Sequence, residues 1–271
     1  MSAPEESNFS PPEYELLGTR INALTLEEMV LLPEKAVDRG AGWVVGYQNL
    51  HGLYLYHRPE TGATMRAFYE RAAYTHVDGM PLVWMGRLLG YPLQRRHRHT
   101  SVDWLPPLLE RCAARGLRVY FLGSRPGVGE RAASYFRQRL PRLRLATHHG
   151  HFDAAPGSEE NETVVEEINA FRPHVLLVGM GMPRQEGWIL ENADRLRVNV
   201  VWNLGAFMDY FAGEVPTPPR WMGRLGLEWL HRLLADPRRL WRRYLLEPVF
   251  VLRLFLKELV AKWKSGGREK G

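Results

Sequence analysis

The sequence predicts an α/β fold of the Rossmann-like type, a parallel sheet with helices on both faces, followed by a C-terminal helical appendage. Six short β-rich runs alternate with segments of helical length along the 271 residues, a pattern typical of βαβ units and hence of a parallel sheet. The last fifth of the chain differs in charge and is helical in pattern throughout. We therefore expect a disordered N-terminal tail at 1–17, an α/β domain at 18–213 and a basic amphipathic helical appendage at 214–271.

The expected elements follow from apolar runs and from the residues that interrupt them. Thr25-Leu-Glu-Glu28 has the capping-box spacing that begins a helix. The six expected strands cover 43–47, 74–77, 118–122, 144–147, 174–178 and 198–202, with helices at 61–73, 128–140 and 159–171, and others after Pro81 and Pro183. Asn49 and His51 are expected on the loop that follows the first strand.

The composition excludes several classes of protein. A single cysteine, Cys112, excludes an intramolecular disulfide framework and fits a reducing compartment. The polar start of the chain, 1–12, lacks the basic and apolar regions of a signal peptide. The longest apolar run, 249–256, is interrupted by Arg253 and is far shorter than the ~20 residues of a membrane span.

The appendage carries the positive charge of the chain. From Glu214 onward there are 13 Lys and Arg against 6 Asp and Glu, which accounts for all of the net charge of +6. Helical periodicity places the apolar residues Leu240, Trp241, Tyr244 and Leu245 opposite the basic residues Arg238, Arg239, Arg242 and Arg243, and predicts a second apolar stripe of Leu252, Phe255, Leu256 and Leu259. Such helices suit an anionic membrane surface; the alternative is a helical pair packed on the domain with a solvated basic face.

Asp78 stands at the expected C-terminal tip of the second strand, just before a helix opened by Pro81. In open parallel sheets this edge is where ligands bind. The carboxylate therefore either caps the helix or belongs to a functional site.

Glycines follow three of the expected strands, at Gly123, at Gly179 with Gly181, and at Gly205. Glycine turns before helix N-termini suit a phosphate-bearing ligand. The dinucleotide fingerprint fails because position 184 is arginine, and neither a P-loop nor a Gly-x-Ser-x-Gly elbow is present. The cluster His148, His149, His151 and Asp153 lacks the spacing of known metal motifs, so we expect no metal site.

The strand-end groups that remain are Asn49, Asp78, Arg98, Asp103, Gln185 and Asp209. An isolated aspartate near phosphate-binding turns suits a general base that deprotonates a hydroxyl. Nearby arginines would hold a diphosphate and its developing charge. The residues by themselves thus favour a transferase that uses a nucleotide-linked donor.

Seven sequence motifs follow one another along the chain and allow a comparison with known families. They are VDGMP at 77–81, RHTSVD at 98–103, FLGSRPGV at 121–128, THHGHF at 147–152, GMPRQE at 181–186, GAFMDYFAG at 205–213 and PRWMGRLGLEWL at 219–230. Together they resemble the WecG/TagA/CpsF family of bacterial glycosyltransferases, known as glycosyltransferase family 26, from about Gly18 to Tyr244.

The resemblance implies an inverting transfer of a sugar from a UDP-sugar to a sugar carried on undecaprenyl diphosphate. The transferred sugar would be of the N-acetylmannosamine, N-acetylmannosaminuronic acid or glucose type, for a cell-surface polysaccharide or teichoic acid. The resemblance also implies peripheral attachment to the cytoplasmic face of the bacterial inner membrane, without a metal cofactor or a nucleic acid partner, and allows a homo-oligomer.

The resemblance also assigns roles to residues. Asp78 matches the proposed base, and Gln185 and Asn49 match other catalytic positions. The donor-binding positions are Gly123, Ser124, Gly181, Gly205 and Asp209, and the phosphate- and acceptor-binding positions are Arg98, Arg232, Arg239 and Arg242. Many members have Thr-x-Asn where this chain has Tyr47-Gln48-Asn49, a difference that bears on sugar specificity.

Two other classes remain as alternatives. A nucleic-acid-binding protein could use the basic, Trp-rich appendage to stack bases and neutralise phosphates. It would bind oligonucleotides more tightly than anionic liposomes. A Rossmann-like oxidoreductase would bind NAD(P), although its fingerprint is missing.

Overall fold

The computed structural model describes residues 9–215, 222 and 226–266. At its centre lies an eight-stranded sheet with the order β1-β2-β4-β3-β8-β7-β5-β6. The strands are β1 (Glu13–Leu16), β2 (Thr19–Asn22), β3 (Trp43–Gln48), β4 (Tyr74–Val77), β5 (Arg118–Gly123), β6 (Arg144–His148), β7 (Val175–Gly179) and β8 (Val200–Asn203). Every neighbouring pair is parallel except β1 with β2. The predicted parallel sheet is confirmed, with two more strands than the six expected.

The additional strands form an N-terminal hairpin. The predicted disordered tail at 1–17 is wrong for Glu13–Leu16, which pairs with Thr19–Asn22; residues 1–8 lie outside the described part of the chain. Leu17 and Gly18 both have positive φ, as a two-residue type I′ turn requires. Leu16 and Ile21 are fully buried, so the hairpin belongs to the core.

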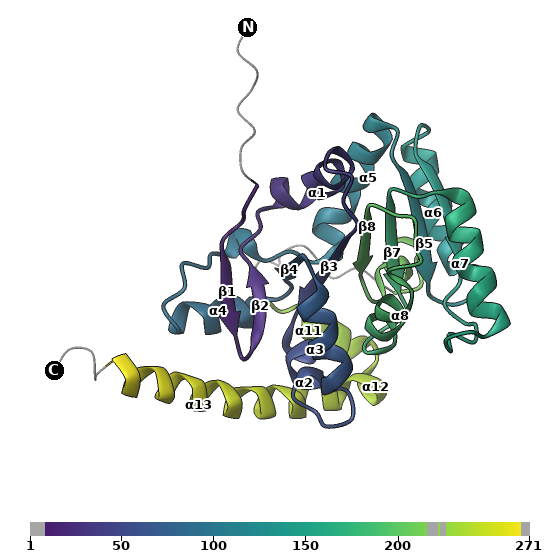
Figure 1. Ribbon diagram of the computed structural model, residues 1–271. Helices are drawn as coiled ribbons and strands as arrows, with labels where there is room; N and C mark the ends of the chain where they lie inside the picture. The colour runs from purple at the N-terminus through teal and green to yellow at the C-terminus, as the bar shows by residue number, and fades with distance from the viewer. Residues whose placement is uncertain (1–8, 216–221, 223–225, 267–271) are drawn as a thin grey trace, which may run out of the picture.

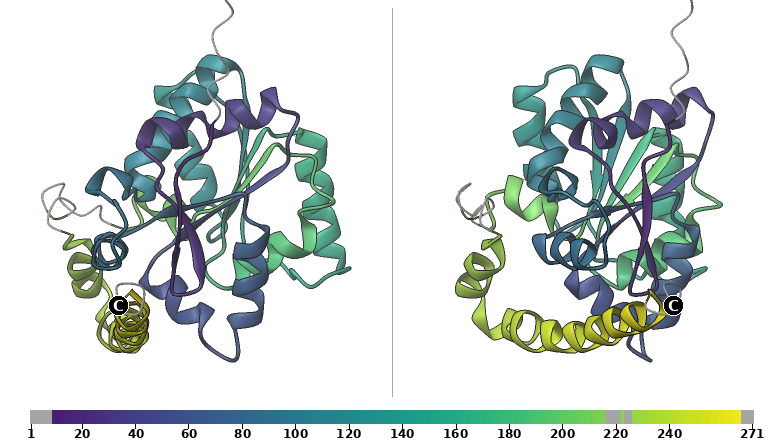
Figure 2. Two further views of the ribbon diagram at one scale, coloured as in Figure 1. Left: turned by 60° about the vertical axis from the view of Figure 1, so that its left-hand side comes forward. Right: turned by 90° about the vertical axis from the view of Figure 1, so that its left-hand side faces the viewer.

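Helices cover both faces of the sheet, as predicted (Figures 1 and 2). One face carries α1 (Leu26–Asp38), α5 (Ser101–Arg115), α6 (Val128–Arg139) and α9 (Phe207–Phe211), and the other carries α3 (Gly62–Arg71), α7 (Glu159–Phe171) and α8 (Arg184–Asn192). The capping box at Thr25 and Glu28 begins α1, as expected. On the first face the rings of Trp104 and Trp202 stack with centroids 4.1 Å apart.

Two short helices, α2 (Leu50–Tyr56) and α4 (Met80–Leu88), lie on the hairpin side of the sheet. The 3₁₀ turn η1 (Arg95–His97) follows α4 in the chain. Asn49 lies just after β3, as expected, and is the N-cap of α2, where its side chain accepts a hydrogen bond from the N–H of Gly52. The loop expected at His51 is wrong, because His51 lies inside that helix. The capping hydrogen bond fixes the side chain of Asn49 at the end of β3.

The described part of the appendage is helical. It comprises α11 (Glu228–Ala235), α12 (Pro237–Trp241), the π-helical segment η2 (Arg242–Leu246) and α13 (Glu247–Gly266), which curve along one side of the domain and beneath it (Figure 2). Val251 and Phe255 of α13 are buried in a cluster with the hairpin, α2 and α4. In the described ranges no helix combines the length and apolar character needed to cross a bilayer.

The π-helical segment changes which residues share a face of the appendage. We expected Leu240 and Tyr244 to lie opposite Arg242 and Arg243, but all four line one cavity. A π-helical turn takes an extra residue, so the regular 100° progression assumed from sequence fails there. The predicted stripe beyond Pro248 also divides, because Phe255 is buried whereas Leu252 and Leu256 are about half exposed.

Candidate active site

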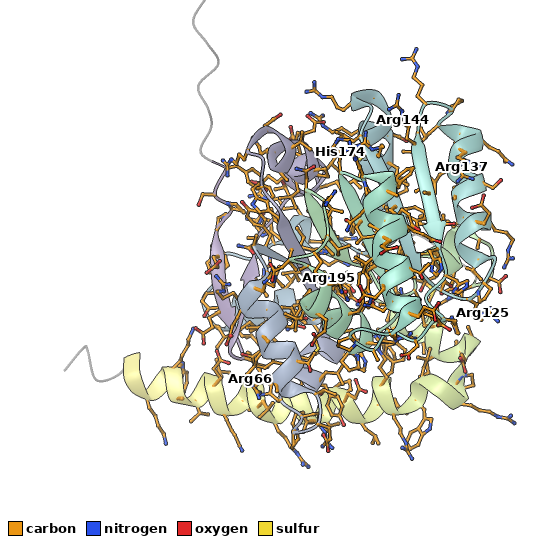
Figure 3. The ribbon with its side chains drawn as sticks, turned by 45° about the vertical axis from the view of Figure 1, so that its right-hand side comes forward. Arg66, Arg125, Arg137, Arg144, His174 and Arg195 are labelled. Atoms are coloured by element: carbon orange, nitrogen blue, oxygen red, sulfur yellow. The ribbon has the colours of Figure 1, made fainter. Side chains whose placement is uncertain are left out.

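The carboxyl ends of six strands, β3 to β8, open onto a cavity of about 1130 Å³ that the appendage closes on one side. Parallel strands bring the residues that follow them to one edge of the sheet. Figure 3 illustrates this polarity: Arg125, after β5, lies toward the appendage, whereas Arg144 and His174, at the starts of β6 and β7, lie at the opposite end. The predicted residues that line the cavity are Asn49, Asp78, Ser124, Gly181, Gly205, Asp209, Arg232 and Arg242.

Asp78 is positioned by the neighbouring strand. Its N–H donates to the carbonyl of Gln48 at 2.9 Å, which extends the β3–β4 pairing by one residue. Its Oδ2 accepts a hydrogen bond of 3.1 Å from Nδ2 of Asn49. The N-cap of α4 is Gly79 and not Asp78. The alternative in which Asp78 merely caps the helix is therefore wrong, and its carboxylate faces the cavity.

The electrostatic surroundings of Asp78 suit a base. Burial raises the pKa of Asp78 above its ordinary value, while the charge of Arg232, the hydrogen bond from Asn49 and the charge of Arg98 oppose that rise. A carboxylate with a raised pKa accepts a proton more readily than one in water. Asn49 and Arg232 both favour its ionised form, the form that can accept a proton.

The predicted arginines separate into two groups. Arg232 and Arg242 line the cavity, and Arg232 lies 5.2 Å from the centroid of the Tyr210 ring. Arg98 does not reach the cavity wall. Its buried guanidinium forms ion pairs with Glu228 of α11 and, at 3.4 Å, with Asp103, so it joins the domain to the appendage. The side chain of Arg239 lies outside the described residues.

The glycine turns are held by Gln185 from within. The N–H groups of Gly181 and Gly205 donate to Oε1 of Gln185 at 3.2 and 3.1 Å. Gln185 itself is fully buried and lies behind the cavity wall. Gly123 is not part of the wall either; a Cβ there would lie 2.2 Å from the carbonyl oxygen of Gly179, so β5 and β7 require glycine for packing.

A buried glutamate orients Gln185. Oε1 of Glu186 accepts hydrogen bonds from Nε2 of Gln185 at 2.8 Å and from Nδ2 of Asn203 at 2.6 Å. Oε2 of Glu186 has no partner. Burial raises the pKa of Glu186 to about 7, and the two donated hydrogen bonds oppose the rise. The carboxyl therefore links α8 with the end of β8. Glu186 lies in the motif at 181–186, but the sequence analysis assigned it no role.

Ser124 and Asp209 form a polar pair at the β5 end of the cavity. The hydroxyl of Ser124 donates to Oδ1 of Asp209 at 2.8 Å. Ser124 has φ of 59°, a left-handed conformation that is uncommon for serine and that clusters at ligand sites. Both residues were predicted for donor binding, and the structure brings them together.

Other cavity residues escaped the sequence analysis. His51 of α2 and Glu247 at the start of α13 form a half-buried pair at 2.7 Å. Arg243 lies beside Arg242 in the cavity wall. The pair of adjacent arginines could have indicated this position, but regular helical periodicity placed both on a solvated face. In the part of the chain described, no three His, Cys, Asp or Glu side chains are arranged to hold a metal ion.

Substitution of Glu186 by glutamine is expected to remove a pH-dependent contribution to stability. The folded-state pKa of about 7 exceeds the ordinary 4.5, so the folded state binds this proton more tightly than the unfolded state. Wild-type stability should therefore fall relative to Glu186→Gln as pH rises from about 4.5 to 7, by roughly 3 kcal/mol. Urea unfolding of both proteins between pH 5 and 8 measures this, with the exposed Glu110→Gln as control. A stability difference independent of pH would contradict the assignment.

Comparisons with known proteins agree with this geometry. The model of the glycosyl transferase WecG/TagA/CpsF family matches residues 14–265. N-acetylglucosaminyldiphosphoundecaprenol N-acetyl-beta-D-mannosaminyltransferases from Staphylococcus aureus strains MRSA252 and NCTC 8325 are each 30% identical over 211 residues, covering 78% of this chain and 76% of the relative. The match extends through the α/β domain and most of the appendage. The chain belongs to the WecG/TagA/CpsF family of glycosyltransferases.

Proposed function

We propose that this glycosyltransferase moves an N-acetylmannosamine-type sugar from a UDP-sugar to N-acetylglucosamine on undecaprenyl diphosphate, with inversion at the transferred carbon. The printed activity of the relatives supports the sugar and the acceptor. The observation that carries the proposal is Asp78, a partly buried carboxylate with a raised pKa, positioned by Asn49 and facing the large cavity.

In this mechanism Asp78 takes the proton from the attacking hydroxyl of the acceptor sugar. The oxygen forms a bond to the anomeric carbon of the donor while the bond from that carbon to the β-phosphate oxygen of UDP breaks. One displacement of this kind inverts the anomeric centre. Asn49 holds the carboxylate in one orientation through its hydrogen bond of 3.1 Å, so less reorganisation is needed when the hydroxyl arrives.

The leaving diphosphate needs positive charge rather than a proton. Arg232, Arg242 and Arg243 line the appendage side of the cavity, where their guanidinium groups can donate to phosphate oxygens. We propose that they stabilise the diphosphates of donor and acceptor without a metal. Ser124 and Asp209 would contact the nucleoside part of the donor at the far end of the cavity.

Asp78→Asn is expected to reduce kcat by about 10²–10⁴-fold, the usual contribution of a general base. The variant keeps the shape of the side chain and can still pair with Asn49. UDP affinity, measured by calorimetry, should stay within a few-fold of wild type, because Asp78 does not carry the donor phosphates. Turnover is measured as UDP release with a short-chain lipid diphosphate acceptor. A variant with near wild-type turnover would disprove the role.

Asn49→Ser is expected to move the acid limb of the kcat/KM profile to higher pH. Serine keeps an N-cap for α2 but loses the N–H that donates to Asp78 and lowers its pKa. With that donor gone, Asp78 holds its proton to higher pH, and activity falls earlier as the solution is acidified. The melting temperature should change little. An unshifted acid limb would mean that another group controls it.

A row of exposed apolar side chains supports membrane attachment of the appendage. It consists of Trp241, Leu245, Leu246, Val249, Leu252, Leu256, Val260 and Trp263. Exposed basic residues, Arg253, Lys257 and Lys264, accompany it on α13. We propose that this row contacts an anionic membrane surface on the cytoplasmic side of the inner membrane, which would bring the cavity to an acceptor held in the lipid.

Leu252→Glu combined with Leu256→Glu is expected to weaken binding to anionic liposomes at least tenfold. Both side chains are about half exposed, and the buried contacts of Val251 and Phe255 remain. Liposome sedimentation provides the measurement, and Leu26→Glu, at an exposed apolar position outside the appendage, provides the control. Unchanged binding would exclude this row as the contact. Stronger binding of the wild type to oligonucleotides than to liposomes would favour the nucleic-acid alternative.

A further inference from the structure

The cavity extends behind Asp78 into a recess that the mechanism above does not use. We define the inner recess as the part of the wall formed by Tyr47, His76, His99, Thr100 and Trp104. Each of these side chains borders the cavity, although no more than 9% of its surface is exposed. They come from β3, β4, the segment after η1, and α5. The recess is therefore a built feature of the domain and does not depend on the appendage.

His76 lies beneath Asp78 on the same face of β4, because side chains two residues apart in a strand share a face. Its partner across the β3–β4 ladder is Tyr47. The rings of Trp104 and Trp202 lie edge-on to His76, with centroids 5.9 and 5.7 Å away, and the Tyr47 ring lies 6.0 Å away. Aromatic rings therefore surround the imidazole on several sides.

Several polar atoms around His76 have no hydrogen-bond partner. Both ring nitrogens of His76 lack a hydrogen-bond partner, as do the indole nitrogens of Trp104 and Trp202. Most buried polar atoms in native proteins are paired, and each unpaired one costs about 1–3 kcal/mol. Trp202 is not among the wall residues, but His76 and Trp104 are. The three unpaired atoms on these two side chains indicate that part of a ligand completes the site.

The chemistry of His76 restricts what that ligand part can be. Burial lowers the pKa of His76 to about 3; His99 adds to the lowering and the Val77 backbone opposes it. The imidazole is therefore neutral at physiological pH and offers one donor and one acceptor. A phosphate or carboxylate would find no cation among the five side chains. A neutral amide offers a carbonyl acceptor, an N–H donor and, in an acetamido group, a methyl group suited to aromatic walls.

The reaction geometry points to a particular amide. The attacking hydroxyl must lie within hydrogen-bond reach of Asp78, and the anomeric carbon of the donor must lie about 3 Å from that oxygen. The substituent at C2 is attached to the neighbouring carbon. It is thus among the parts of the donor sugar closest to Asp78, and of these it is the one that carries an amide.

From this geometry we propose that the inner recess binds the 2-acetamido group of the transferred sugar and that His76 is a specificity-determining residue for it. The inference rests on the proposed function, because it assumes that Asp78 acts at the anomeric carbon. Tyr47 forms the opposite wall. A Cβ at Gly205 would lie 3.0 Å from the Tyr47 hydroxyl, so Tyr47 reaches the turn after β8 and limits the depth of the site.

The test compares UDP-N-acetylmannosamine with UDP-mannose, which differ in the acetamido group, in wild type and His76→Phe. The variant is expected to lose about 10–100-fold in affinity and in kcat/KM for the acetylated donor, and less than about threefold for UDP-mannose. His76→Asn, which retains a donor and an acceptor, should recover part of the preference. UDP affinity should be equal in all three proteins. Tyr120→Phe, a buried ring on β5 away from the cavity wall, is the packing control.

The possible outcomes separate a specificity role from a structural one. Phenylalanine removes two unpaired nitrogens from the interior, so the melting temperature of His76→Phe should equal or exceed that of wild type. An equal loss for both donors, or an unchanged preference, would overturn the inference. If wild type prefers the acetylated donor and His76→Phe does not, but no sugar is transferred to the lipid acceptor, the recess stands and the proposed function fails. A wild type that binds neither donor would refute both.

Discussion

The partial burial of one aspartate, Asp78, among groups that favour its ionised form is the constraint on which the arrangement of this sheet edge depends. Burial of Asp78 favours its protonated form, and two opposing contacts come from different parts of the chain. Asn49 is delivered by the N-terminus of α2, and Arg232 by α11 of the appendage. The domain alone therefore supplies an aspartate whose charge is only partly supported. The site is complete when the appendage lies against the sheet edge.

The contacts that hold the appendage are consistent with this dependence. Arg98 forms a buried ion pair with Glu228 of α11, and His51 contacts Glu247 at the start of α13. Removing one partner of a buried ion pair such as Arg98–Glu228 costs several kcal/mol, because the other charge is left unpaired. These pairs fix the position of the helices between them, which carry the arginines of the cavity. Arg98 thus links the domain to the appendage, and its charge also lowers the pKa of Asp78.

Much of this could be predicted from sequence, because strand ends in a parallel sheet converge regardless of side-chain detail. That rule placed Asn49, Asp78 and Asp209 at the cavity correctly, and the family resemblance added Ser124. The hairpin was missed because β1 and β2 are four-residue strands of mixed polarity next to a polar tail. The cavity position of Arg243 was missed because a π-helical segment interrupts the regular helical period. Gln185 was expected at the surface of the site, yet it lies behind it. Only tertiary contacts reveal that its amide holds two turns together.

The N-terminal hairpin has a consequence for how the two ends of the chain depend on each other. Leu16 and Ile21 share a buried cluster with Val251 and Phe255 of α13, and the N–H of Leu17 donates to Glu258 at 3.1 Å. β1 and the turn after it thus form part of the surface on which α13 packs. A substitution in the hairpin would therefore act on the arginines of the cavity only indirectly, through the position of α13. The position of α13 on the domain thus depends on the packing of the β1–β2 hairpin.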